Sequence, residues 1–204
     1  MDTKLRELLA ELERQGSEAD ARETNPAKKM LNLDPETAQL VSLLVRSSGA
    51  RRVLEIGTSN GYSTIWLASA AAETGGQVIS LDRSAEKQAM ARKNLLRAGL
   101  ADHVALILGE ATGLVRGLAG PFDFVFFDGD RVTAPEQLEL IVPKLATCAL
   151  IAADNAISHP DEIRGYLNAI SGTEGFMHMV LPVGKGLSLA YRGARPAASG
   201  SGDR

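Results

Sequence analysis

The sequence has a single cysteine, Cys148, among its 204 residues. One thiol cannot form a disulfide within the chain, so a secreted scaffold held together by disulfides is excluded. No run approaches the ~20 consecutive apolar residues of a membrane-spanning helix. The 22 basic and 25 acidic residues give a net charge of −3, and no block of Lys or Arg stands out. Net charge therefore gives no sign of nucleic-acid binding.

The first residues also lack the apolar core of a secretory signal peptide, because Asp2, Lys4, Arg6 and Glu7 interrupt them. We therefore expect a cytoplasmic protein. The hydrophobic content of 45% and the charged content of 23% are ordinary for a globular chain. A chain of this length suits one domain with a sizeable core.

The N-terminal segment has the pattern of a helix followed by a loop. Leucines at positions 5, 8, 9 and 12 form one stripe of a helix over about residues 2–15. Residues 16–28 are polar and contain Gly16 and Pro26, which predicts a linker or loop. We expect an arm over residues 1–34, a main domain over 35–193 and a disordered tail over 194–204. The apolar stripe also suggests a homodimer.

From residue 51 onward, short apolar runs alternate with longer segments of helical period. This alternation predicts an α/β fold with a mostly parallel sheet and helices on both faces. Two final runs around Pro182 and Gly184 predict an antiparallel hairpin that brings the sheet to seven strands. The apolar runs, which we interpret as strands, are residues 53–56, 78–81, 104–108, 124–127, 148–153, 175–181 and 186–192.

Ligands of an open α/β sheet bind at the carboxyl ends of its strands. After the first strand, Gly57 and Gly61 allow a sharp turn and a close approach of the backbone to a ligand. Asp82 ends the second strand, where an acid can accept hydrogen bonds from both hydroxyls of a ribose. Glu110 and Ala111 follow the third strand and could border a purine base. The glycine loop alone is weak evidence, because a generic tight turn explains it equally well.

The ends of the fourth and fifth strands carry Asp128, Asp154 and Asn155. Each has an ordinary structural explanation, as a residue before a glycine turn or in an Asx-turn. Together on neighbouring strand ends they form a cluster of hard oxygens that suits Mg²⁺ or Ca²⁺. The sequence therefore predicts a nucleotide-like cofactor beside a divalent cation.

Five stretches in this order resemble the class I S-adenosylmethionine-dependent O-methyltransferases, which have a Rossmann-like fold. They are VLEIGTSNGYSTIWLA, VISLD, FDFVFFDGDR, IAADN and LPVGKGLSLAYR. The likeness is to the cation-dependent group that contains catechol and caffeoyl-CoA O-methyltransferases, including its small bacterial members. It runs from about Met30 to Arg192.

The resemblance implies a role for each matching residue. Glu55 and the loop from Gly57 through Gly61 and Tyr62 to Ser63 would hold the methionine part of the cofactor, and the backbone of Leu33 would contact the cofactor. Asp82 would bind the ribose, and Glu110 and Ala111 would border the adenine. Asp128, Asp154 and Asn155 would bind Mg²⁺, Mn²⁺ or Ca²⁺, with Asp128 also near the cofactor's amino group.

The sequence departs from the family pattern in two places. Arg131 stands where the family usually has a lysine that is thought to help deprotonate the acceptor. An arginine stays protonated, so Arg131 could only act electrostatically or bind an acidic group of the acceptor. The long insertion of plant members after the Asp-Asn pair is missing, which implies a more open acceptor site.

The residues and the resemblance together predict a methyl transfer to a hydroxyl of a small, catechol-like or phenolic acceptor. Three alternatives stay open: a hydroxylated tRNA base as acceptor, an NAD-dependent oxidoreductase, and a metal-independent or catalytically weak S-adenosylmethionine-binding protein. The absent second close glycine speaks against NAD, and the mildly acidic charge speaks against tRNA.

Overall fold

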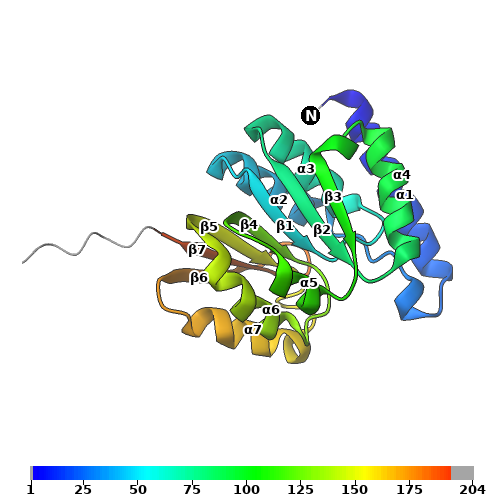
Figure 1. Cartoon of the computed structure of the whole chain (residues 1–204). Helices are drawn as coiled ribbons and strands as arrows, with labels where there is room; N and C mark the ends of the chain where they lie inside the picture. The colour runs from blue at the N-terminus through cyan, green and yellow to red at the C-terminus, as the bar shows by residue number, and fades with distance from the viewer. Residues whose placement is uncertain (1, 194–204) are drawn as a thin grey trace, which may run out of the picture.

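A computed structural model describes residues 2–193 of the chain (Figure 1). The predicted tail over 194–204 lies outside the described residues. The helices are α1 (Thr3–Arg22), α2 (Pro35–Ser48), α3 (Tyr62–Thr74), α4 (Ala85–Ala98), α5 (Ala111–Gly117), α6 (Ala134–Ile141) and α7 (Pro160–Gly172). The strands are β1 (Arg52–Ile56), β2 (Gln77–Asp82), β3 (Val104–Leu108), β4 (Phe122–Phe127), β5 (Leu145–Ala153), β6 (Phe176–Leu181) and β7 (Leu187–Arg192).

The strands form one seven-stranded sheet in the order β3-β2-β1-β4-β5-β7-β6. Strands β1 to β5 pair in parallel, and β7 pairs antiparallel with both β5 and β6. The predicted α/β class, the strand number and the closing hairpin are therefore confirmed. The order reverses between β1 and β4, and such a switch point is where open α/β sheets bind ligands.

Two helical layers cover the sheet, α1–α4 on one face and α5–α7 on the other (Figure 1). Alternate residues of the central strands point to opposite faces, so Phe124 and Phe126 pack into the first layer and Val125 and Phe127 into the second. All four are buried. This packing holds the carboxyl ends of β1, β4 and β5 at one rigid edge.

Helix α1 is longer than the sequence pattern predicts. It continues through Gly16 to Arg22, where a loop was expected. Gly16 is buried, and a Cβ atom on it would lie 2.4 Å from the Asn32 side chain. Gly16 therefore serves a close helix–chain contact inside the helix instead of ending it. The ion pairs of Glu18 with Arg14 and Arg22 lie on the exposed side of the same stretch.

The leucine stripe of α1 packs on its own domain. Leu8, Leu9 and Leu12 belong to the same core as α2 and α3. Figure 1 shows α1 alongside α4, where Arg97 forms an ion pair with Glu11. The stripe therefore does not require a second chain, and the homodimer stays a prediction that light scattering can test.

Truncation of Leu9 tests this packing. Leu9 is 3% exposed. We expect Leu9→Ala to lower the free energy of unfolding by about 2–5 kcal/mol, because it leaves a cavity between α1 and the domain. Urea unfolding measures the change. Replacement of the exposed Glu7 by alanine is the control, and equal stability of the two variants would show that α1 is not part of the core.

Another difference lies between α6 and β5. The pattern predicts a strand from residue 148, whereas β5 begins at Leu145, soon after α6 ends at Ile141. Pro143 cannot continue the hydrogen bonding of a helix, so a short 3-10 turn over Val142–Lys144 intervenes. Among the helices of residues 2–193, none is both long enough and apolar enough to cross a membrane.

Candidate functional site

Glu55 of β1 is a buried residue that supports the candidate site from within the protein. Its side chain is 0% exposed, and both of its oxygens accept hydrogen bonds from hydroxyl groups. Ser63 donates to Oε1 at 2.6 Å, and Thr64 and Ser80 donate to Oε2 at 2.5 Å each. The carboxylate thus ties β1 and β2 to the first turn of α3. Because the three hydroxyls enclose its carboxylate, Glu55 could act on a cofactor only through them. Its side chain lies behind the loop that follows β1.

Burial raises the pKa of Glu55 from its ordinary 4.5 to about 7, against the opposing effect of the three hydroxyl donors. The folded state therefore keeps a proton that the unfolded state releases above about pH 4.5. The stabilisation from this proton is full below pH 4.5 and is lost as the pH rises through about 7.

Glu55→Gln tests this pKa. The wild type is expected to lose up to about 3 kcal/mol of unfolding free energy between pH 5 and pH 8 through this group. The variant cannot ionise, so its stability should fall less over the same range. Urea unfolding at both pH values measures the difference. Parallel pH profiles of the two proteins would contradict the raised pKa.

The loop from Gly57 to Ser63 connects β1 to α3. Gly57 has φ 106°, and a Cβ atom there would lie 2.3 Å from the backbone oxygen of Asp128. Only glycine permits this approach of the loop to β4. Gly61, at φ 87°, precedes the first residue of α3. The N–H of Gly61 donates to the Thr58 carbonyl and that of Tyr62 to Oδ1 of Asn60, whereas the next N–H groups of the first turn have no partner within the helix.

Asp82 stands at the end of β2 with its carboxylate held by two backbone groups. Its Oδ2 accepts from the N–H of Ser59 and its Oδ1 from that of Ser84, both at 2.8 Å. The first bond joins Asp82 to the Gly57–Ser63 loop. Each oxygen keeps a further lone pair, so the carboxylate can still accept from two ribose hydroxyls.

The remaining predicted cofactor residues line the same edge or support it. Glu110 caps α5 by accepting from the N–H groups of Thr112 and Gly113, which hold its pKa below the ordinary value. Ala111 begins that helix. Tyr62 and Leu33 are 2% and 3% exposed and belong to the core. Their side chains therefore fix the loop, and only their backbone groups are available to a cofactor.

Asp128 and Asp154 lie side by side at the ends of β4 and β5. The N–H of Asp128 donates to the Ile56 carbonyl, and the N–H of Asp154 donates to the Phe127 carbonyl. Loss of solvation raises the pKa of both carboxyls, and the charge of Asp154 raises that of Asp128 further. Asp154 is 4% exposed, and its Oδ1 is buried without a hydrogen-bond partner. The pair therefore resists full ionisation unless a positive charge lies beside it.

A divalent cation fits this chemistry. Two carboxylates and the amide oxygen of Asn155 are hard ligands, and the partnerless Oδ1 of Asp154 is the kind of atom that a cation would satisfy. Within residues 2–193, no three His, Cys, Asp or Glu side chains are grouped for a metal, so a cation here would need the Asn155 amide as its third protein ligand. Asn155 has φ 65°, a conformation that asparagine tolerates.

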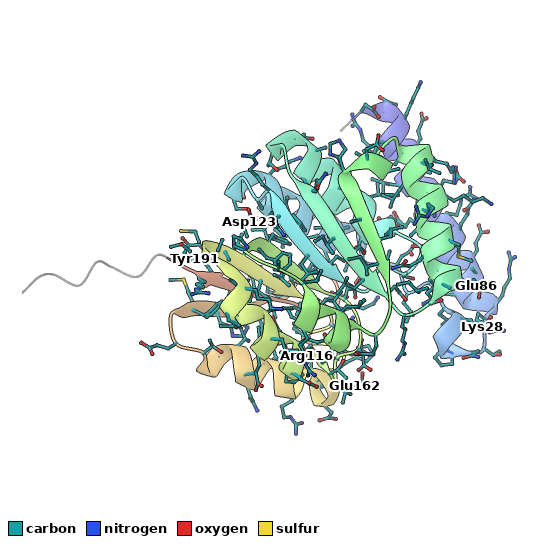
Figure 2. The ribbon with its side chains drawn as sticks, viewed as in Figure 1. Lys28, Glu86, Arg116, Asp123, Glu162 and Tyr191 are labelled. Atoms are coloured by element: carbon teal, nitrogen blue, oxygen red, sulfur yellow. The ribbon has the colours of Figure 1, made fainter. Side chains whose placement is uncertain are left out.

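Arg131 is occupied by two contacts. Its Nε and Nη2 lie 2.9 and 2.6 Å from Oε2 of Glu162, in the first turn of α7 (Figure 2). Its Nη1 donates to Oδ1 of Asn155 at 3.0 Å. The guanidinium therefore positions the Asn155 amide. Binding an acidic acceptor through Arg131 would first require these contacts to break.

Sequence reasoning missed three residues of this site. Glu162 lies 31 positions after Arg131, and no spacing rule links them. Asp34, just before α2, has a buried Oδ2 without a partner and raises the pKa of Asp154. Lys185 lies in the β6–β7 turn, 3.9 Å from Asp34, and its charge lowers the pKa of both acids. In the sequence, only the two glycines that flank Lys185 indicated that this turn packs closely against its neighbours.

Residues 2–164 match the profile of a family described as O-methyltransferase. Over 123 residues the chain is 40% identical to a catechol O-methyltransferase of Mycobacterium tuberculosis, and over 131 residues it is 35% identical to one of Niastella koreensis. These matches cover 60% and 62% of this chain but only 56% and 59% of the relatives, little more than half their length.

The structure is also similar to a solved one. An O-methyltransferase from Bacillus cereus in complex with SAH superposes with a TM-score of 0.78 at 29% sequence identity. The superposition covers 94% of this chain and 91% of the other. The likeness thus includes α1 and the closing hairpin as well as the segment that carries the sequence motifs.

Proposed function

The chain belongs to the O-methyltransferase family, and we propose that it transfers a methyl group from S-adenosylmethionine to a hydroxyl oxygen of a small catechol-like acceptor, assisted by a divalent cation. One observation carries this proposal: Asp128, which is followed on the neighbouring strand by the buried Asp154, lies directly against the glycine loop at the β1–β4 switch point. The predicted cofactor loop and the predicted cation ligands would thus share one edge of the sheet.

The residues of the first three strand ends would bind and orient the cofactor. Asp82 accepts from the ribose, the N–H groups at the start of α3 face the carboxylate, and Glu110 and Ala111 border the adenine. S-adenosylmethionine supplies an electrophilic methyl group: its S–CH3 bond breaks as the O–CH3 bond forms, and SAH, a methyl ether and the hydroxyl proton are released. Alignment of the acceptor oxygen supplies much of the acceleration.

Asp128, Asp154 and Asn155 would hold the cation. The bound cation supplies a Lewis acid that lowers the pKa of the acceptor hydroxyl. Asp128 also lies against the glycine loop, so it links the two binding sites. Asn155 contributes an amide oxygen whose direction Arg131 and Glu162 fix.

The proposed acceptor class rests on the chemistry of a bound cation and on the similarity of the chain to named relatives. Two adjacent hydroxyls, as in a catechol, can reach one cation together and place one oxygen toward the methyl group. The relatives from Mycobacterium tuberculosis and Niastella koreensis are named catechol O-methyltransferases. The segment between Asn155 and α7 is short, from residue 156 to 159, so no long insertion follows the acids.

Removal and return of the cation test this function. With catechol and S-adenosylmethionine, we expect methyl transfer to stop in excess EDTA and to return when Mg²⁺ or Mn²⁺ is added in excess of the chelator. Liquid chromatography of the methylated product measures the rate. Full activity in EDTA would contradict the cation's role and leave a metal-independent methyltransferase, whereas no product under any condition would contradict the acceptor class.

A further inference from the structure

The turn between β6 and β7 is attached to the segment that follows the acid pair. The carbonyl of Lys185 accepts from the N–H groups of Ile157 at 3.1 Å and Ser158 at 3.0 Å, and that of Gly186 accepts from Ala156 at 2.9 Å. These three donors begin directly after Asn155. The backbone of Lys185 is therefore fixed at the rim of the candidate cation site.

Glycines on both sides bring this turn close to its neighbours. A Cβ atom on Gly184 would lie 2.4 Å from Oγ1 of Thr37 in α2, and one on Gly186 would lie 2.5 Å from Cγ1 of Ile157. Both glycines have positive φ, at 54° and 90°. The turn therefore packs closely between the start of α2 and residues 156–158. Lys185 is the charged residue of this turn.

The ammonium of Lys185 has unused donors. Its closest acidic contact within residues 2–193 is Oδ1 of Asp34 at 3.9 Å, beyond hydrogen-bond range, and its side chain is 40% exposed. Lys185 therefore brings a positive charge to the rim of the candidate cation site, with donors that its contact to Asp34 does not use.

Arg131 is less suited to this part, because Glu162 and Asn155 hold its guanidinium through Nε, Nη1 and Nη2. An ammonium on a four-carbon stem differs from this fixed guanidinium, since it has three donors and can turn toward a ligand. The positive charge expected three positions after Asp128 is thus available from the β6–β7 turn.

We propose that Lys185 contacts the acceptor and stabilises its hydroxyl oxygen as an anion, in the place that Arg131 does not fill. This role rests on the proposed function. Lysine is charged at neutral pH, so Lys185 would favour the ionised acceptor without removing its proton. Asp34, Asp128, Asp154 and Arg131 are the charged groups that surround this contact and balance its charge.

The probe is 4-nitrocatechol, whose visible absorbance reports its own ionisation. It is titrated into the full-length protein with SAH and Mg²⁺ present, so binding is observed without turnover. For the wild type we expect binding of the anion and an ionisation midpoint below that of the free compound. Lys185→Met should weaken binding by about 10-fold or more and raise the midpoint by about one pH unit, as expected for loss of a charge-assisted hydrogen bond.

Two further variants separate a contact with the acceptor from a structural role. Lys185→Arg keeps the charge and should restore most of the binding. Lys93→Met removes an exposed lysine of α4 and should bind as the wild type does.

Several results would overturn the role of Lys185. They are wild-type binding in Lys185→Met, no recovery in Lys185→Arg, or a loss in Lys93→Met equal to that in Lys185→Met. Circular dichroism verifies that each variant is folded. Failure of the wild type to bind 4-nitrocatechol is a distinct result, because it contradicts the proposed acceptor class itself and removes the role of Lys185 with it.

Discussion

Asp154→Asn is expected to lower the rate of methyl transfer by about 100- to 1000-fold while cofactor affinity stays near that of the wild type. A bound cation supplies several kcal/mol of charge stabilisation, and each 1.36 kcal/mol is a factor of ten in rate. Asp154 is the acid with the buried, partnerless Oδ1, and it stands on β5, one strand further from the glycine loop than Asp128. Steady-state kinetics and calorimetric titration with S-adenosylmethionine measure the two effects.

Stability separates this effect from misfolding. Burial raises the pKa of Asp154, so its charge opposes folding above that pKa, and a neutral asparagine should leave the unfolding temperature equal or higher. Asp161→Asn, at an exposed position of α7, is the matched control and should leave the rate unchanged. A wild-type rate in Asp154→Asn would show that this acid is not part of the catalytic site.

The second large effect is expected from Asp82→Ala. This variant loses a charged acceptor for two ribose hydroxyls, and each such bond contributes about 1.5–3 kcal/mol. Because some of that contribution is recovered by solvent, we expect a loss of about 2–4 kcal/mol, which is a 30- to 1000-fold higher dissociation constant for S-adenosylmethionine. Calorimetric titration measures it.

Asp123→Ala provides an unusually close control. Asp123 also accepts from two successive N–H groups, those of Arg51 and Arg52, at 2.9 and 2.8 Å. It lies at the other end of the strands, well away from α5 and α7 in Figure 2. This variant loses the same type of backbone bonds as Asp82→Ala but should keep the cofactor affinity. Equal dissociation constants in the two variants would contradict the ribose contact of Asp82.

The sheet and its ligand edge could be predicted because local patterns determine them. Apolar runs of strand length alternate with helical segments, and the position of Asp82, Asp128 and Asp154 after such runs places them at the carboxyl ends of strands. The closing hairpin followed from the turn residues between two short runs. These features depend on period and spacing, which the sequence displays directly.

Features that depend on contacts between distant segments were not predictable in this way. The sequence pattern around Gly16 predicts the end of a helix. In the structure, Gly16 instead allows the close approach of the Asn32 side chain. Glu55 has the pattern of a ligand-facing acid until Ser63, Thr64 and Ser80 enclose it. The neighbours that decide each case come from other elements.

The two positively charged side chains of the site, Arg131 and Lys185, show the same limit of sequence-based prediction. The sequence places Arg131 after the first acid but does not indicate that Glu162 binds it. Lys185 belongs to a turn whose pattern predicts only a hairpin. Its nearness to Asp34 and the acids appears when the turn packs against residues 156–158. Sequence position alone therefore does not show which positively charged side chain of the site is free to bind a ligand.

The most direct test of the central claim is the fate of an isotope-labelled methyl group. The protein is incubated with catechol, Mg²⁺ and S-adenosylmethionine carrying a ¹³C methyl, and the products are examined by carbon NMR and mass spectrometry. The proposed function predicts a labelled methoxy carbon on the ring oxygen together with an equal amount of SAH, and both should be absent in Asp154→Asn. SAH release without a labelled ether, or label in the ether at an undiminished rate in Asp154→Asn, would contradict it.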